Sequence, residues 1–336
     1  MVTIRDVAKA AGVSVTTVSI VINDKAKERS IPETTQEKIN RTMRELGYQP
    51  NLSARRLRSG YKHAPMIVFF WPLDCRISIL ASFLNAFSGE MKRRGFDCEL
   101  VVHTYESGSL DQYDNAMLKN GYNGIIVGAC TEGDIEHLEI IRPQMPVVLL
   151  NRESEVFSTV SIDNDIVGKM AAEQFQRKEY KSAAVFASNR GYLASNIRVN
   201  AFMRYCRDFG ISIEDNFVIR DASTVEGGYC IAENFCVMEN RPRAIFCDSD
   251  AIAFGAMKAL NDKGMRIPDD VEILTIDMTV SGTTSYSTPS LSVIEMPNEE
   301  IGSTVIHLLS EKVITNSQEP THIKIAPRLI LRDSFV

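Results

Sequence analysis

The stretch TIRDVAKAAGVSVTTVSIVIN, residues 3–23, sets the architecture of the N-terminal region. Its first apolar residues recur at intervals of three and four, which places them on one helical face: Ile4, Val7, Ala8 and Ala11. Thr3, with Asp6 three positions later, is a suitable N-cap for this helix. Gly12 breaks the pattern, and Ser14 then caps a second helix with an apolar stripe expected at Val18, Val21 and Ile22.

A third amphipathic segment, from near Pro32 to Gly47, follows the pair and carries three inward positions: Ile39, Met43 and Leu46. Two short helices joined by a tight turn and braced by a third predict a helix-turn-helix. The second helix would enter a DNA major groove and present Thr16, Thr17 and Ile20 to base edges, with Ser14 near a phosphate. A three-helix module that binds another protein remains the alternative.

The charge distribution agrees with a nucleic-acid-binding head. Residues 1–62 hold twelve Lys and Arg against six Asp and Glu, a net charge of +6. The other residues hold 25 basic against 37 acidic side chains, a net charge of −12 within the overall −6. A basic head on an acidic body indicates that only the head meets a polyanion.

Composition narrows the class of protein further. With 336 residues and 44% hydrophobic content, the chain can form two or three cores. No apolar run approaches the ~18 residues of a membrane span, and the N-terminus has no apolar signal region, so we expect a cytoplasmic protein. The seven cysteines include no CxxC pair, which favours reduced thiols over disulfides or zinc.

Beyond residue 62, short apolar runs alternate with amphipathic segments. The strand candidates are 67–70, 100–103, 124–127, 147–150, 183–186, 244–247 and 272–276, and the helical ones include 79–94, 166–178, 195–209 and 250–263. This alternation predicts α/β folding with parallel, doubly wound sheets. About 270 residues exceed one core, so we expect two lobes, with ligands bound beyond the carboxyl ends of strands.

Signatures of enzymes are absent from the sequence. It contains no GxSxG, Walker loop, GxGxxG or HExxH motif, and its five histidines are dispersed. We therefore expect no catalytic residue, no metal site and no cofactor.

The N-terminal motifs resemble those of the lactose-repressor (LacI/GalR) family of transcription regulators. The resemblance rests on TIRDVAKAAGVS at 3–14, on TTVS and VIN at 16–23, and on LGYQPN at 46–51. In the body, PRAIFC at 242–247, IPDDV at 267–271 and TPSL at 288–291 are similar to the family's periplasmic-binding-protein-like sensor. The resemblance implies a homodimer that binds a pseudo-palindromic DNA operator under the control of a small effector.

The resemblance also implies roles for single residues of the head. Val15, Thr16 and Ile20 would select the operator sequence, and the phosphate contacts would be Thr3, Ser14, Thr17, Asn23 and Ser30. Ile20 departs from the polar residue of many members; it cannot hydrogen-bond a base but can touch a thymine methyl. The loop 24–30 is longer than in some members, so the match of Ser30 to a phosphate-contact position of the family is weaker than that of the other residues.

Residues 51–60, NLSARRLRSG, resemble the family's hinge helix. Asn51, Ala54 and Leu57 match its pattern, with Leu57 as a wedge in the minor groove and Arg55 beside the DNA backbone. A solvated linker is the alternative, because an exposed leucine among arginines is ordinary.

The expected organisation has three parts. A helix-turn-helix domain spans 1–49, a hinge 50–62, and an effector-binding and dimerisation domain 63–336. Within the last part, the N-lobe is expected at 63–160 and 291–322, and the C-lobe at 161–290 and 323–336.

The effector residues are expected at strand ends and at positions that match the family. The stronger candidates are Arg198, Asp277, Ser249 and Asp250; the weaker ones are Asp74, Leu80, Asn151 and Arg152. Each carboxylate could instead cap a helix or stabilise a lobe. Ser223 and Ile79-Leu80 stand where some members have aromatic residues, and Trp71 could supply a stacking platform or pack in the core.

A pocket rich in Asp, Arg and Asn favours a sugar or polyol over a purine. A solute-binding protein and an enzyme on the same fold are the alternatives, opposed by the helix-turn-helix and by the missing catalytic motifs. The sign of control, induction or corepression, stays open, and a dimer is expected rather than a tetramer.

Overall fold

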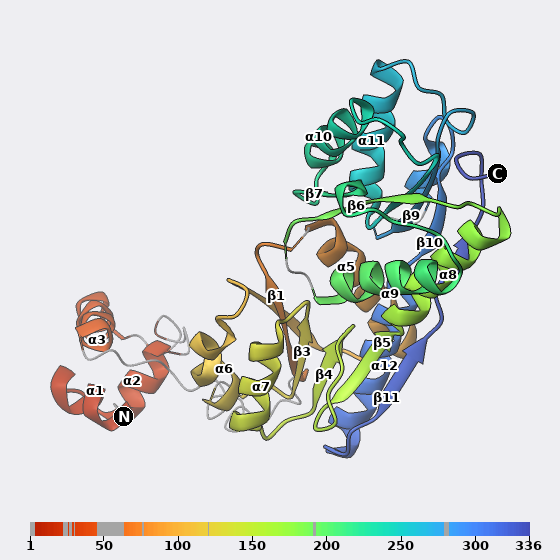
Figure 1. Cartoon of the computed structure of the whole chain (residues 1–336). Helices are drawn as coiled ribbons and strands as arrows, with labels where there is room; N and C mark the ends of the chain where they lie inside the picture. Colours follow the sequence, from red (N-terminus) through yellow and green to blue (C-terminus); the bar gives the residue numbers. More distant parts are fainter. Residues whose placement is uncertain are drawn as a thin grey trace. The chain divides into compact units, whose positions relative to one another are not determined.

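The computed structural model describes residues 4–22, 26, 29, 31–45, 64–75, 77–119, 121–190, 193–278 and 282–336. Its contacts divide the chain into two compact units (Figure 1). The head comprises Met1–His63 with Lys119–Gly121, and the body comprises Ala64–Leu118 and Tyr122–Val336. Each is described by itself below.

The head contains the three predicted helices: α1 (Ile4–Ala11), α2 (Val15–Ile22) and α3 (Glu33–Glu45). Their shared core contains most of the predicted inward residues, namely Val7, Ala8, Ala11, Val18, Val21 and Ile39, with Met43 packed against it. Gly12 ends α1 with φ +66°, and Val13 N–H donates to the Ala8 carbonyl at 3.0 Å. This left-handed position is why the turn contains a glycine.

The first lobe of the body is built on a parallel sheet in the order β11-β5-β4-β3-β1-β2. Its strands are β1 (Met66–Pro72), β2 (Glu99–Tyr105), β3 (Gly124–Gly128), β4 (Val147–Leu150), β5 (Ser158–Ile162) and β11 (His322–Ile325). Helices α5 (Ile77–Arg94) and α12 (Asn298–Thr315) cover one face. The other face meets η1 (Leu110–Tyr113), α6 (Asp114–Lys119) and α7 (Glu132–Ile141).

The second lobe repeats this plan in the order β12-β10-β9-β8-β6-β7. Its strands are β6 (Ala183–Ser188), β7 (Val218–Asp221), β8 (Ala244–Cys247), β9 (Glu272–Asp277), β10 (Ser292–Glu295) and β12 (Arg328–Ile330), of which β12 runs antiparallel to β10. Helices α8 (Asn164–Arg177) and α9 (Leu193–Asp208) cover one face, and α10 (Val225–Cys236) and α11 (Asp250–Asp262) the other. Two short turns, η2 (Asp215–Phe217) and η3 (Thr283–Tyr286), complete the lobe.

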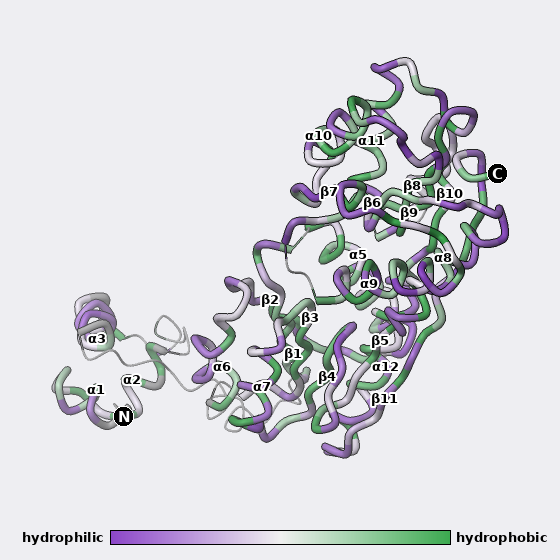
Figure 2. Tube along the Cα trace, viewed as in Figure 1, coloured by the Kyte–Doolittle hydropathy of each residue, from purple (hydrophilic) through white to green (hydrophobic). Residues whose placement is uncertain are grey.

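Strand β1 shows why these runs are apolar throughout. All seven of its residues are buried, and they alternate between two cores. Ile67, Phe69 and Trp71 pack on the α5 and α12 side, whereas Val68 and Phe70 pack on the opposite side. A parallel sheet covered on both faces requires such continuous hydrophobic strands, which appear in green along the tube in Figure 2.

The chain passes between the lobes after β5, between β10 and α12, and between β11 and β12. Two of the lobe boundaries expected from the sequence differ from those set by the strand pairing. Residues 292–295 pair with β9 and belong to the second lobe, although 291–322 was assigned to the first. Residues 322–325 pair with β5 and belong to the first lobe, although 323–336 was assigned to the second. Strand pairing, which periodicity does not reveal, sets both boundaries.

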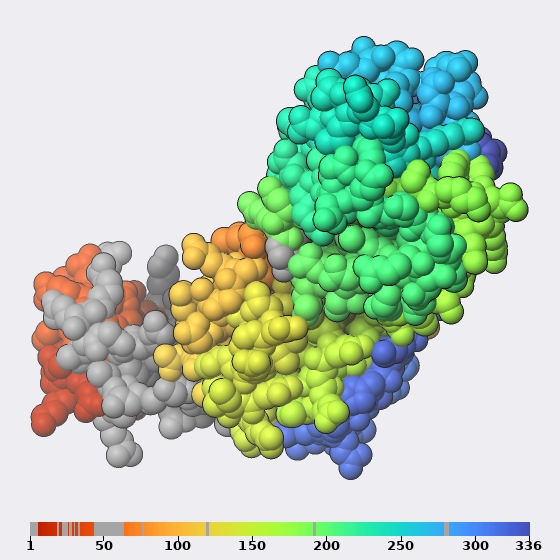
Figure 3. All heavy atoms as spheres, in the orientation of Figure 1, coloured from red at the N-terminus to blue at the C-terminus, as the bar shows by residue number. Residues whose placement is uncertain are grey.

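Within the body the two lobes meet along a continuous surface (Figure 3). One buried cluster, which includes Phe87 of α5, Phe175 of α8 and Ile301 of α12, extends through both lobes. All seven cysteines are free thiols. In the described part of the chain, no helix combines the length and apolar character needed to cross a bilayer.

Candidate functional site

The exposed face of α2 is short and carries no charge. Ser14 Oγ accepts the Thr17 N–H at 3.0 Å and shares a 2.8 Å hydrogen bond with the Thr17 hydroxyl, so Ser14 caps the helix. Val15 and Thr16 are exposed and Ile20 is half-buried, while Val18 and Val21 face the core. The side chains that the sequence assigns to base edges therefore lie outside the head core.

Seven of the predicted DNA-contact residues lie outside the described residues: Thr3, Asn23, Ser30, Asn51, Ala54, Arg55 and Leu57. The last four form the expected hinge. Their roles stay predictions.

A cavity of about 110 Å³ lies between the two lobes, at the carboxyl ends of strands from both sheets. Trp71, Ala129 and Asn151 end or follow first-lobe strands, and Asp248 and Met278 follow strands of the second lobe. We call it the interlobe cavity; its lining is Trp71, Cys75, Ile79, Phe83, Ala129, Leu150, Asn151, Arg152, Ala194, Ser195, Arg198, Ser223, Asp248, Ser249, Met278, Met296 and Asn298. Ligands of open α/β sheets bind at such strand ends.

The first-lobe wall of the cavity is largely apolar and aromatic. Trp71 is 3% exposed and packs edge-on against Phe69, with Phe83 of α5 5.8 Å away. A Cβ at Gly128 would lie 2.8 Å from two carbons of the indole, so only glycine fits beneath this ring. The indole Nε1 is buried and finds no acceptor among the described residues.

Arg152 and Asn151 add polar groups to that wall. Arg152 is 9% exposed. Its Nε donates to the Cys130 carbonyl at 2.6 Å, and its Nη1 donates to the Asn151 carbonyl at 2.7 Å. Two backbone acceptors thus hold the guanidinium in one orientation. Burial raises the pKa of the nearby Cys75 thiol to about 11, with Asp74 as the second cause, so this thiol is neutral near pH 7.

On the second-lobe wall, Arg198 is 1% exposed and lies in the second turn of α9. Its Nε donates to Asn164 Oδ1 at 2.8 Å, and its Nη1 contacts Met278 Sδ at 3.6 Å. Asn164 begins α8, directly after the first crossing between the lobes. The guanidinium therefore links the cavity to this crossing.

Asp248 is the main cavity residue that the sequence analysis missed. It is 2% exposed, and its Oδ2 accepts the Ser188 N–H at 2.9 Å and the Ser195 hydroxyl at 2.6 Å. Its position directly after the apolar run AIFC was a usable signal, because the strand end faces the ligand side. Ser195, Met278, Met296, Asn298 and Phe83 were missed as well.

Four of the eight predicted effector residues line the interlobe cavity, namely Asn151, Arg152, Arg198 and Ser249. Asp250 does not: it is 1% exposed, and its carboxylate accepts the Ala251 N–H at 2.9 Å within the first turn of α11. The residue that caps α11 is Ser249, whose hydroxyl accepts the Ile252 N–H, and Asp250 is the first residue of the helix.

The other three predicted residues, Asp74, Leu80 and Asp277, also lie outside the lining. Asp277 ends β9 and accepts the Thr284 hydroxyl at 2.7 Å. Asp74 accepts the Ser107 hydroxyl at 2.7 Å in a neighbouring cavity. Leu80 packs against the core. Met278 and Ile79 line the cavity instead, because adjacent residues point in different directions.

No group of three or more His, Cys, Asp or Glu side chains in the described ranges is arranged to hold a metal ion. The cavity instead offers an aromatic wall, two arginines, one aspartate and several neutral polar groups. These groups can bind a small polar molecule by hydrogen bonds and stacking.

Comparison with known proteins finds one family match in the head and one in the body. Residues 3–51 match the family described as "Bacterial regulatory proteins, lacI family", and residues 172–335 match "Periplasmic binding protein-like domain". The chain is 27% identical to the HTH-type transcriptional repressor PurR of Pasteurella multocida, over 99% of this chain and 98% of that protein.

Solved structures of LacI family regulators are also similar to this chain. A LacI family transcription regulator from Clostridium acetobutylicum is 30% identical, with a TM-score of 0.77 over 80% of this chain and 99% of that one. The transcriptional regulator CelR in complex with cellobiose shares the fold at 21% identity, with a TM-score of 0.70 over 99% of this chain and 100% of that one. The two matched segments and these full-length similarities show that this chain belongs to the LacI family of bacterial regulatory proteins.

Proposed function

We propose that this protein is a transcription repressor that binds a specific DNA operator and whose affinity for it is set by a small molecule in the interlobe cavity. The observation that carries the proposal is the cavity itself, whose walls come from both lobes. A ligand that contacts both walls binds one relative orientation of the lobes more tightly and so shifts their equilibrium.

The DNA-binding part of the proposal rests on the head. Its second helix exposes Val15 and Thr16 beside a capped N-terminus, and a recognition helix reads bases from such positions. In a homodimer, two heads would bind pseudo-palindromic half-sites. The hinge residues Asn51, Ala54, Arg55 and Leu57 would then order on the DNA, with Leu57 inserted in the minor groove.

We propose a sugar or sugar derivative as the effector. The pairing of an aromatic ring, Trp71, with Asn151, Arg198 and Asp248 suits a ring that has an apolar face and hydroxyl groups at its edge. The cellobiose complex of CelR supports this class of ligand. We further propose that the protein acts in the cytoplasm and not as an enzyme.

Two measurements test this function. A thermal-shift screen of sugars, sugar phosphates and nucleosides should find a compound that raises the melting temperature, because a ligand of the native state stabilises it by mass action. A gel shift on selected operator DNA should weaken steeply as salt increases, because phosphate contacts release counterions. The proposal would be contradicted if the protein did not bind DNA, or if its affinity for DNA did not change with salt concentration.

A further inference from the structure

Two hydrogen-bond donors in the wall of the interlobe cavity have no partner in the part of the chain that the structure describes. One is the indole Nε1 of Trp71, which is buried and unbonded. The other is Nη2 of Arg152, since the guanidinium makes only its Nε and Nη1 bonds to two backbone carbonyls. The two residues are 3% and 9% exposed. A buried donor is rarely left unpaired, so the indole N–H points to a missing acceptor. Nη2 of Arg152 is not among the fully buried atoms, so it is a donor that a ligand in the cavity can reach.

The positive charge of Arg152 is also uncompensated. Both of its acceptors are neutral carbonyls, and no described carboxylate forms an ion pair with it. A buried charge without a counter-charge is costly, and a ligand can supply the counter-charge that the chain lacks.

The cavity as a whole favours a negative ligand. Its described charged residues are Arg152, Arg198 and Asp248, whose formal charges add to +1. Asp248 accepts hydrogen bonds from Ser188 and Ser195 on the second lobe, and Arg198 is bonded to Asn164. Neither interaction offsets the charge of Arg152 on the opposite wall.

Resting on the proposed function, we infer that the effector carries an anionic group, a carboxylate or a phosphate ester, whose oxygen accepts hydrogen bonds from Arg152. A second oxygen of the same ligand accepts the Trp71 N–H. The fixed orientation of the guanidinium leaves its Nη2 edge available, and charge-assisted bonds of this kind are short and strong. The ligand class is thereby narrowed from sugars to sugar acids and sugar phosphates.

The single tryptophan of the chain makes the test direct, because Trp71 itself lines the cavity and its fluorescence reports occupancy. The full-length protein is titrated with inorganic phosphate as the minimal probe, and with glucose, gluconate and glucose 6-phosphate as a matched neutral, carboxylate and phosphate set. The set is repeated with ribose, ribonate and ribose 5-phosphate. Arg152→Gln removes the charge, and Arg152→Lys retains it. Arg177→Gln, an exposed arginine of α8 outside the cavity, is the control.

The expected result is saturable binding of an anionic probe that is at least about ten-fold tighter than binding of its neutral parent. Arg152→Gln should weaken that binding about ten-fold or more, Arg152→Lys should weaken it less, and Arg177→Gln should leave it unchanged. Whether the sugar acid or the sugar phosphate binds shows whether the anionic group of the effector is a carboxylate or a phosphate ester.

The inference is overturned if neutral parents bind as tightly as their anionic counterparts, if Arg152→Gln leaves anionic binding unchanged, or if no anionic probe, phosphate included, binds. Melting temperatures of the variants verify that each is folded. Operator binding by the same preparations separates this result from the proposed function. If the protein binds operator DNA and binds neutral sugars but no anionic probe, the inference of an anionic effector is refuted, while the proposed function as a regulator stands.

Discussion

Arg198 illustrates at the scale of a residue how the cavity and the fold depend on each other. Its guanidinium is 1% exposed and donates to Asn164 Oδ1 at 2.8 Å. Arg198→Met would keep much of the volume but remove that donor, so the half-buried Asn164 would lose its partner. We expect a loss of about 1–3 kcal/mol in the free energy of unfolding, measured by urea denaturation.

The matched control is Arg207→Met, which changes an exposed arginine in the last turn of the same helix. It should alter the free energy of unfolding by no more than about 0.5 kcal/mol. Equal effects of the two substitutions would mean that the hydrogen bond between Arg198 and Asn164 does not stabilise the fold.

Ile20 provides the second prediction at this scale. It is half-buried on α2 and is not among the residues of the head core, so its role should lie in DNA contact. Ile20→Ala would remove an apolar contact to a thymine methyl and relax the base preference at one operator position. The expected loss is about 1–3 kcal/mol in the binding free-energy difference between the preferred base and the others. Selection from a randomised DNA pool measures this, and an unchanged base preference would refute the specifying role.

Single residues also show where sequence reasoning ends. Asn151, Arg152, Arg198 and Ser249 were predicted near the effector and do line one cavity. Asp277 was chosen and Met278 was not, because the sequence identifies a strand end but not which of two adjacent side chains turns inward. For the same reason Asp250 was preferred to Asp248.

At the scale of elements, α10 and α11 pack through two glycines. A Cβ at Gly255 would lie 1.9 Å from the Val225 carbonyl oxygen, and one at Gly228 would lie 2.2 Å from the Ile252 carbonyl oxygen. Because these neighbours are backbone atoms, they cannot move aside without separating the helices. Gly255→Ala should therefore destabilise the protein by about 1–3 kcal/mol, measured by urea denaturation.

Gly89 of α5 is the matched control, because a Cβ there would meet nothing within 4 Å. Gly89→Ala should stabilise the protein by about 0.5–1 kcal/mol, since alanine is the better helix former. The same sign for both substitutions would contradict the packing argument.

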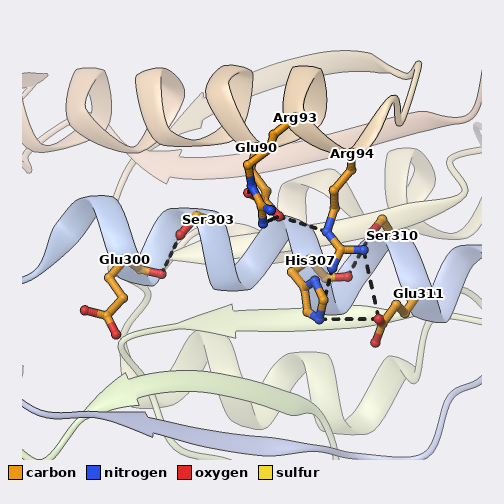
Figure 4. Close-up of polar contacts among 8 residues, drawn as sticks. All are labelled: Glu90, Arg93, Arg94, Glu300, Ser303, His307, Ser310 and Glu311. Atoms are coloured by element: carbon orange, nitrogen blue, oxygen red, sulfur yellow. Dashed lines mark hydrogen bonds and ion pairs between the residues drawn. The ribbon is translucent and has the colours of Figure 1, made fainter.

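Helices α5 and α12 lie side by side and are joined by a polar network (Figure 4). The Glu90 carboxylate accepts hydrogen bonds from Arg93 and Arg94 at 2.7–2.8 Å. Arg94 also forms a hydrogen bond of 3.1 Å with His307 of α12. The Arg93 hydrogen bonds, helped by those of Arg94, hold the pKa of the Glu90 carboxyl below its ordinary value of 4.5.

This pKa predicts how stability changes with pH. Because the folded-state pKa is lowered, the stabilisation is complete above about pH 4.5 and is lost as the pH falls through the folded-state pKa. Glu90→Gln should therefore lower the urea midpoint at pH 7, and its difference from the wild type should shrink at acidic pH. Glu136→Gln, at an exposed position of α7, is the control. A pH-independent difference would mean that Glu90 acts through packing alone.

The elements found from the sequence are those with strong patterns. All seven predicted strands are present. Six of them are fully buried parallel strands, which are unbroken apolar runs, and the seventh, the edge strand β2, is only partly buried. Five strands were missed because their short sequences contain polar residues that only sheet pairing explains: β5 (STVSI), β7 (VIRD), β10 (SVIE), β11 (HIKI) and β12 (RLI).

At the scale of the whole molecule, the helix-turn-helix pattern and the charge asymmetry predicted a DNA-binding head, and the alternation of strands and helices predicted a two-lobed body. They were insufficient to place the lobe boundaries, since β10 and β11 each pair with a strand more than ten residues away in sequence. The sequence favoured a class of effector, a sugar or polyol, but not its identity, because the cavity combines residues from both lobes, such as Trp71, Arg152 and Asp248.

The central claim is that occupancy of the interlobe cavity changes the affinity of the head for its operator. The direct test is the Kd of the full-length protein for a labelled operator, selected from randomised DNA and measured by fluorescence anisotropy with and without the compound that most raises the melting temperature. We predict a change in Kd of about 5- to 150-fold, the range of allosteric couplings. A compound that stabilises the protein but changes the operator Kd by less than about two-fold would contradict the account.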